Sequence, residues 1–332
     1  MDFKSIIQSI KAKDFKPIYF LHGEEPYFID AISNAIIENS LDEAERDFNQ
    51  AIVYGKDSDV IQVISQAKEY PMMAQRRLVV VREAQDLKKI EELASYMEEP
   101  NESTVFVINY KFKKFDSRKK LFKAAKKNGI VYQSDKIKEY NLFGWINSYV
   151  KDRGYSITPK ASELLVEFLG DDLSKVINEF NKLEILVEKG TTINEVHIEE
   201  NIGISKDYNV FELVNAIAIR DVTKANVIIN YFDHNPKAGS IIMVIANIFK
   251  LHSQMMKVHF LGNKSKENVA ASLKMHPFVA QKMLNSIKIY NPKKIAANIS
   301  TLHEYDLKSK GVDNPSSTPG QLMKELIYKL MH

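Results

Sequence analysis

The first 135 residues alternate between short apolar runs and longer segments with the spacing of an amphipathic helix. The apolar runs are nearly continuous, which is typical of strands buried on both faces. We therefore expect strands at residues 17–23, 50–55, 78–83, 104–110 and 130–134. Between them, helical spacing predicts helices at 26–39, 57–70, 86–98 and 117–127, the second of which Asp57 or Ser58 caps. This alternation predicts a doubly wound α/β domain with a mostly parallel sheet.

After about residue 140 the strand signals disappear, and the rest of the chain is predicted to be all-α. Thr158-Pro159 is expected to start a helix that ends at Leu169-Gly170, and Asp171-Asp172 to cap the next one. The face that this next helix buries is predicted to consist of Leu173, Val176, Ile177, Phe180, Leu183, Leu186 and Val187. A polar turn at 203–209 precedes a second helical group, which includes segments 241–262 and 319–332.

The composition is ordinary for a protein of several globular domains, with 45% hydrophobic and 27% charged residues among 332. No stretch approaches the uninterrupted apolar length that is needed to span a bilayer, so we expect no membrane association. The first 15 residues mix lysine and aspartate with apolar residues, which predicts a short amphipathic helix and a cytoplasmic protein. The lack of cysteine excludes disulfides, thiolate metal ligands and thiol nucleophiles.

The net charge is only +3, but two blocks of opposite charge follow each other. Residues 83–102 are rich in Glu and Asp, whereas 111–128 carry nine lysines and arginines against the single Asp116. Cations interleaved with aromatic rings are typical of a nucleic-acid surface. The alternative is a solvated helix that turns Leu121, Phe122 and Ala125 toward the sheet.

The loop after the first strand is where a doubly wound fold usually binds phosphate. Here it reads GEEPYFID, without the GxxxxGK[ST] pattern or GxGxxG, and Glu24 and Glu25 would repel a phosphate. The fourth predicted strand ends in Asn109 and Tyr110 and so lacks the acids that hold magnesium in an ATPase. Histidines at metal-ligand spacing and the GxSxG motif are missing as well, so we predict no catalytic, cofactor-binding or metal-binding residues.

Two adjacent methionines, Met72 and Met73, follow Pro71 and precede the third predicted strand. Neighbouring residues in a turn do not share a face, so we expect one of the two to point outward. Flexible thioether side chains at an exposed tip suit an adaptable contact with a partner. Alternatively, both methionines tuck under the edge of the sheet.

The order of four segments resembles the delta subunit family of the bacterial DNA polymerase III clamp loader. These segments are YFLHGEEPYFID, PMMAQRRLVVVREAQ, LGDDLSKVINEFNKLEIL and LHEYDLKSKG. The resemblance implies an AAA+-like α/β domain without a functional P-loop at 1–140, a helical lid domain at 141–207 and a helical collar domain for oligomerisation at 208–332.

The resemblance also implies a function. This chain would be a non-catalytic subunit of the DNA-directed DNA polymerase holoenzyme. It would bind and open the beta sliding clamp, so that the ATP-driven clamp loader complex loads the clamp on primed DNA. Met72 and Met73 occupy the positions of the family's clamp-binding pair, commonly Leu-Phe. The implied partners are the clamp, primed DNA and clamp loader subunits of gamma/tau and delta-prime type. ATP would be bound by these partner subunits, and this chain would have no cofactor and no small-molecule substrate.

Two other functions stay open from the residues alone. The basic block, residues 111–127, would make the chain a direct DNA-binding protein. The residues expected to contact DNA are Lys111, Lys113, Lys114, Arg118, Lys119 and Lys120. An enzyme would instead bind a small molecule at the carboxyl ends of the strands, although no reactive cluster stands out there.

Overall fold

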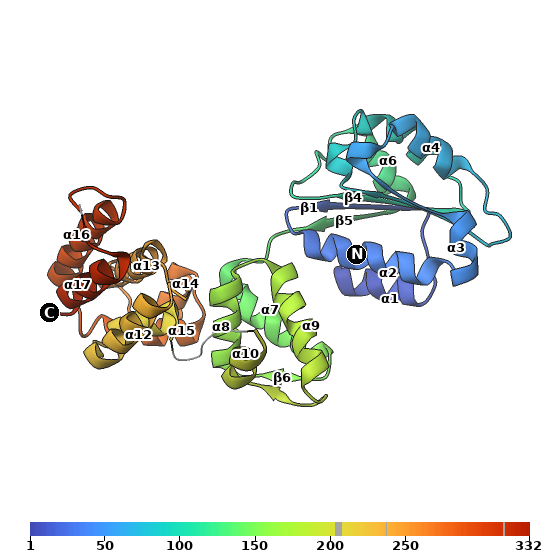
Figure 1. Cartoon of the computed structure of the whole chain (residues 1–332). Helices are drawn as coiled ribbons and strands as arrows, with labels where there is room; N and C mark the ends of the chain where they lie inside the picture. The colour runs from blue at the N-terminus through green and yellow to red at the C-terminus, as the bar shows by residue number, and fades with distance from the viewer. Residues whose placement is uncertain (203–207, 237, 315) are drawn as a thin grey trace. The chain divides into compact units, whose positions relative to one another are not determined.

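The computed structural model describes residues 1–202, 208–236, 238–314 and 316–332, and its contacts divide the chain into two compact units (Figure 1). The first unit spans 1–137 and the second 138–332. The first unit corresponds to the predicted α/β domain. A boundary between lid and collar at residue 207 lies outside the described residues and stays a prediction.

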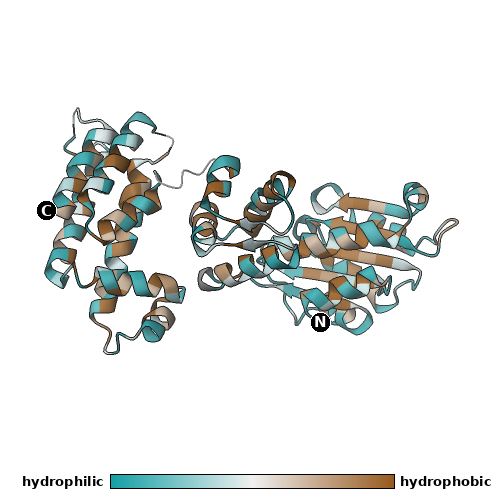
Figure 2. Ribbon diagram, turned by 90° about the horizontal axis from the view of Figure 1, so that it is seen from below, coloured by the Kyte–Doolittle hydropathy of each residue, from teal (hydrophilic) through white to brown (hydrophobic). Residues whose placement is uncertain are grey.

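The first unit is built on a five-stranded parallel sheet in the order β2-β3-β4-β1-β5. Its strands are β1 (Ile18–Gly23), β2 (Gln50–Tyr54), β3 (Arg77–Arg82), β4 (Thr104–Tyr110) and β5 (Ile130–Ser134). All five strands lie where the apolar runs predicted them. In β1, Ile18 and Phe20 belong to one core layer, and Tyr19 and Leu21 to the other. Burial on both faces explains why the strand sequences are so continuously apolar, as the hydropathy colouring of Figure 2 shows.

Helices cover both faces of this sheet, as a doubly wound fold requires (Figure 1). On one face lie α1 (Phe3–Lys11) and α2 (Pro26–Ser40), and on the other α4 (Val60–Lys68), α5 (Ala94–Glu98) and α6 (Lys120–Asn128). The amphipathic N-terminal helix and the helix after β1 are thereby confirmed.

Three helices differ from their predicted extents. Asp59 caps α4, not Asp57 or Ser58, because its carboxylate accepts the Ile61 N–H at 2.8 Å. The predicted helix at 86–98 is two 3₁₀ turns followed by α5, because Lys89 adopts a left-handed conformation (φ 56°) that interrupts an α-helix. Helix α6 begins later, at Lys120.

One helix, α3 (Glu43–Asn49), was not predicted. Its first turn is stabilised by the backbone N–H of Asp42, which donates to the Glu45 carboxylate at 3.0 Å. The spacing of Asp42 and Glu45 is the signal that would have found it. Helix α3 leads directly into β2 and ends beside the loop that precedes β3, since its last residue contacts Met72.

The second unit is mainly helical, but the prediction that it lacks strands is wrong. Strands β6 (Ser156–Ile157) and β7 (Thr192–Ile193) form a parallel pair. Strands of two residues are too short to show an alternating pattern, so only their pairing in space reveals them. The helices around them are α7 (Glu139–Asp152), α8 (Pro159–Leu169), α9 (Leu173–Leu186) and α10 (Glu195–Ile202).

The predicted caps in this region are confirmed. The Thr158 hydroxyl accepts the Ala161 N–H at the start of α8, Gly170 ends α8 with φ 68°, and the Asp172 carboxylate accepts the Lys175 N–H. The apolar face of α9 is buried from Leu173 to Leu183. Leu186, however, is exposed because it lies in the last turn of the helix.

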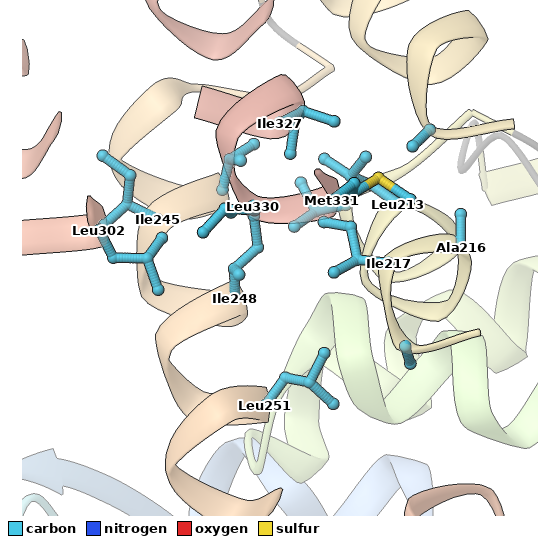
Figure 3. Close-up of a cluster of buried hydrophobic side chains, with 14 of the residues drawn as sticks. Leu213, Ala216, Ile217, Ile245, Ile248, Leu251, Leu302, Ile327, Leu330 and Met331 are labelled. Carbon is cyan, nitrogen blue, oxygen red and sulfur yellow. The ribbon is translucent and has the colours of Figure 1, made fainter. Parts of the chain in front are cut away.

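The remaining helices share one core. They are α11 (Val210–Ala218), α12 (Val222–His234), α13 (Ile241–His259), α14 (Lys266–Leu273), α15 (Pro277–Ser286), α16 (Pro292–Ser309) and α17 (Pro319–Met331). Figure 3 shows side chains from α11, α13, α16 and α17 meeting in this cluster. Within the described ranges, α13 is the one helix long and apolar enough to cross a membrane by length and composition alone. Because α13 buries a row of side chains in this core, it is accounted for as a core helix.

Candidate functional site

The loop between α4 and β3 carries the two methionines and projects beyond α4, near α3 (Figure 1). Helix α4 ends at Lys68. Tyr70 directly precedes Pro71, and a residue before proline disfavours the α conformation, so the helix does not continue into the loop. Met73 is 98% exposed and Met72 50%, so both methionines point outward rather than under the sheet edge. An exposed apolar pair is unusual for a surface loop and is typical of a contact surface.

Two further apolar side chains lie next to this pair and were not predicted from the sequence. Tyr70, in the same loop, is 81% exposed, and Phe48, at the end of α3, is 61% exposed. Phe48 is close to the loop because the next residue, Asn49, hydrogen-bonds to Met72. We call Phe48, Tyr70, Met72 and Met73 the apolar tip. Nothing in the local sequence of α3 signals its share in this surface.

The other end of the sheet, where phosphate would bind, is closed by internal hydrogen bonds. The backbone N–H groups of Glu24 and Glu25 both donate to the Ser134 carbonyl, at 2.8 and 3.2 Å. The carboxylate of Glu25 accepts the Tyr27 N–H at 3.1 Å, and Glu25 is buried. Amide groups that cradle phosphate in a P-loop therefore bind oxygen atoms of the protein itself.

The segment after β4 crosses the same end of the sheet, where β1 finishes. Lys113 pairs with Gly23 in a β-bridge, and the Phe115 N–H donates to Nδ1 of His22 at 3.1 Å. Lys111 is nearly buried and its ammonium lies 2.7 Å from Asp30 and 2.8 Å from Glu83. Burial alone would lower the pKa of Lys111, but the hydrogen bonds to the two carboxylates outweigh it and raise the pKa. Lys111, which directly follows β4, thus links α2 to Glu83, the residue directly after β3, at the carboxyl end of the sheet.

His22 is predicted to make the stability of the first unit depend on pH. Burial lowers the pKa of His22 from its ordinary value near 6.5 to about 4, and the neutral ring accepts the Phe115 N–H. Because the folded-state pKa is depressed, protonation favours the unfolded chain. The contribution is therefore present above pH 6.5 and is lost as the pH falls toward 4.

The measurement is urea unfolding of wild type and His22→Asn between pH 4 and 7.5. Asparagine keeps an acceptor for the Phe115 N–H but does not titrate in this range. The difference in unfolding free energy between the two proteins is expected to shift in favour of the variant as the pH falls. A difference that stays constant across this range would contradict the prediction.

The basic block pairs with acidic side chains, and three of these, Glu83, Glu91 and Glu98, come from the preceding acidic block. Besides Lys111, the ion pairs are Lys114–Asp135 (2.7 Å), Arg118–Asp116 (2.8 Å), Lys119–Glu91 (2.7 Å) and Lys120–Glu98 (3.0 Å). Lys113 lies over the ring of Tyr110 at 5.3 Å. Phe115 and Phe122 pack against Phe20 in the core, whereas Phe112 is exposed. DNA contact by this block stays a prediction, and the ion pairs weaken the positive field on which it depends.

The structure also shows what the histidines of α13 do. His252 is buried, donates from Nδ1 to the Ile248 carbonyl at 2.9 Å and accepts from Asn298 at 2.8 Å. His259 donates to the Tyr290 carbonyl at 2.7 Å. His252 therefore links α13 to α16, and His259 links the end of α13 to the segment between α15 and α16. Across the described part of the chain, no group of three His, Cys, Asp or Glu side chains is placed to hold a metal ion.

Comparisons with known proteins agree in both halves of the chain. The family model for the DNA polymerase III delta subunit matches residues 19–134, and the model for its C-terminal domain matches 207–323. DNA polymerase III subunit delta of Bacillus subtilis is 27% identical over 314 residues, covering 91% of this chain and 90% of that protein. The solved structure of the Bacillus subtilis DNA clamp loader delta protein covers 99% of both chains with a TM-score of 0.59 and 24% identity, which supports the fold. The chain belongs to the DNA polymerase III delta subunit family of clamp loader proteins.

Proposed function

We propose that this delta-family chain binds the beta sliding clamp through its apolar tip and loosens one interface of the ring. The observation that carries the proposal is the exposure of Met72 and Met73 on a projecting loop, at the family's positions for the clamp-binding pair. A partner pocket that covers Met73 would remove from water a side chain that is 98% exposed in the free chain. Tyr70 and Phe48 enlarge the surface, and aromatic side chains are common anchors of protein interfaces.

The proposal places ATP chemistry in the partner subunits of gamma/tau and delta-prime type. It is supported by the phosphate loop, in which the N–H groups of Glu24 and Glu25 are already bonded to Ser134 and the Glu25 carboxylate is buried. This chain would act mechanically and without a catalytic site, in the cytoplasm, where primed DNA is replicated. Clamp contact is then favoured or disfavoured by the nucleotide state of its neighbours.

Contact with those neighbours is proposed to use the C-terminal helical core. Helix α13 exposes Ile242 and Phe249 while its other face is buried, and Phe260, the residue directly after the helix, is exposed as well. These residues are spaced by seven and eleven positions, so they follow one stripe of the helix. An exposed apolar stripe on a core helix suits a partner helix with a matching apolar face.

ATP is predicted not to bind the isolated chain. A phosphate group placed at the β1 turn would meet carboxylates and would have to displace the hydrogen bonds to Ser134. Isothermal titration of ATP with magnesium into the purified chain is expected to give no heat of binding at micromolar concentrations. Micromolar or tighter binding would refute the proposal that only the partner subunits bind ATP.

The experiment that tests clamp binding is a surface-immobilised titration of the purified chain with the sliding clamp of the same organism. Saturable binding is expected, without nucleotide in the buffer. If wild type does not bind the clamp, the proposal fails and the readings as a DNA-binding protein or an enzyme must be reconsidered.

A further inference from the structure

The backbone of Met72 is held by one distant side chain. Asn49, the last residue of α3, accepts the Met72 N–H with Oδ1 at 2.7 Å and donates from Nδ2 to the Met72 carbonyl at 2.9 Å. Nδ2 also donates to the Glu45 carbonyl at 3.0 Å, and Asn49 is completely buried. An amide that bonds both the N–H and the C=O of one residue fixes the direction of the chain at that point.

A second buried side chain, Arg77, ties together the elements around the loop. Its Nη1 donates to the Phe48 carbonyl at 3.0 Å and its Nε to the Gln66 carbonyl at 2.9 Å, while Nη2 lies 2.5 Å from the Glu69 carboxylate. Arg77 therefore joins the end of α3, the last turn of α4 and the start of β3. Both ends of the loop are anchored before its tip is reached.

The residue after the anchored one has a strained backbone. Met73 adopts φ 53°, which side chains other than glycine rarely do, and it has almost no contact that would stabilise this conformation, since it is 98% exposed. Strain at an exposed residue persists only if its neighbours impose it. The hydrogen bonds from Asn49 to Met72 are the contacts placed to do so.

We infer that Asn49 is a positioning residue, which holds the Met72–Met73 tip in the conformation that enters the clamp. The inference rests on the proposed function, because it specifies how the same site is prepared for binding. A loop that is already ordered loses less conformational entropy when it binds, so its affinity is higher than that of a mobile loop with the same side chains. Without Asn49, the binding conformation would be one of several.

The test uses the full chain and two measurements. Hydrogen exchange at the Met72 amide is expected to be protected in wild type and fast in Asn49→Ala, because Oδ1 is its acceptor. If the tip then occupies the binding conformation only about a tenth of the time, affinity for the clamp falls about tenfold. Asn128→Ala is the matched control, since Asn128 also donates to two distant carbonyls, those of Met97 and Glu98. Asn128 comes just before β5, whereas Asn49 comes just before β2, and these two strands form opposite edges of the sheet. The clamp affinity of Asn128→Ala is expected to equal that of wild type.

Adding Asn49→Ala to Met72→Ala/Met73→Ala distinguishes an effect of Asn49 through the tip from a merely structural role. If Asn49 acts through the tip, the added change has no further effect on the residual clamp affinity of folded protein. Equal affinities of wild type and Asn49→Ala would overturn the inference while leaving clamp binding intact, whereas no binding by wild type would sink both. Should Asn49→Ala not fold, wild type alone decides: a Met72 amide that exchanges as fast as in a free peptide overturns the inference, and a protected amide supports it.

Discussion

Replacing Met72 and Met73 together by alanine is expected to weaken binding of this chain to the sliding clamp by more than about 2 kcal/mol, roughly thirtyfold. Both side chains are exposed in the free protein, so their truncation removes contact area at the interface and leaves the core unchanged. The measurement is a surface-immobilised titration of the clamp with each protein, combined with thermal unfolding to show that the variant is folded.

The control for this experiment is Ile61→Ala. Ile61 is also exposed and apolar, but it lies in the first turn of α4, at the end of the helix opposite the tip. The clamp affinity of Ile61→Ala is expected to equal that of wild type. If the two-methionine variant binds like wild type, or if Ile61→Ala is weakened as much, the methionines are not the anchor.

The second large effect is on stability. Gly23→Ala is expected to destabilise the first unit by about 2–6 kcal/mol, from backbone strain and overpacking together. Gly23 has φ 142°, and a Cβ atom there would lie 2.0 Å from the Ser134 carbonyl oxygen. Backbone atoms of the paired strand β5 cannot move away without breaking the hydrogen bonds from Glu24 and Glu25. Chemical unfolding of the full chain, followed by a probe in the first unit, measures the loss.

Gly170→Ala separates strain from steric overlap. Gly170 also has a positive φ, 68°, but an added Cβ would meet no atom within 4 Å. Its cost is therefore expected to be about 1–3 kcal/mol, the strain alone of a backbone conformation (φ 68°, ψ −148°) that is nearly confined to glycine. Equal losses for Gly23→Ala and Gly170→Ala would mean that the close approach to Ser134 has no energetic importance.

Local signals in the sequence were sufficient for much of the fold. The strands of the sheet are apolar on both faces, so their sequences stand out without knowledge of their neighbours. Thr158, Gly170 and Asp172 mark helix ends because each cap is satisfied within three or four residues. The same locality explains why β6 and β7 were not predicted: each is two residues long and exists only through pairing with the other.

The candidate site divides in the same way. The missing phosphate-binding pattern and the adjacent methionines are visible in the sequence, because each depends only on which residues follow one another. The burial of Lys111 was not foreseen, because its partners are distant in the sequence: Asp30 lies in α2 and Glu83 directly follows β3.

By itself, the sequence determined an α/β unit followed by helices, a loop without phosphate ligands and an apolar pair before the third strand. Only the tertiary structure decided that both methionines are exposed, that Phe48 and Tyr70 join them, and that Asn49 holds Met72. The physical reason is distance along the chain. Asn49 and Met72 are 23 residues apart, and their hydrogen bonds form only when β2 and β3 pair in the sheet.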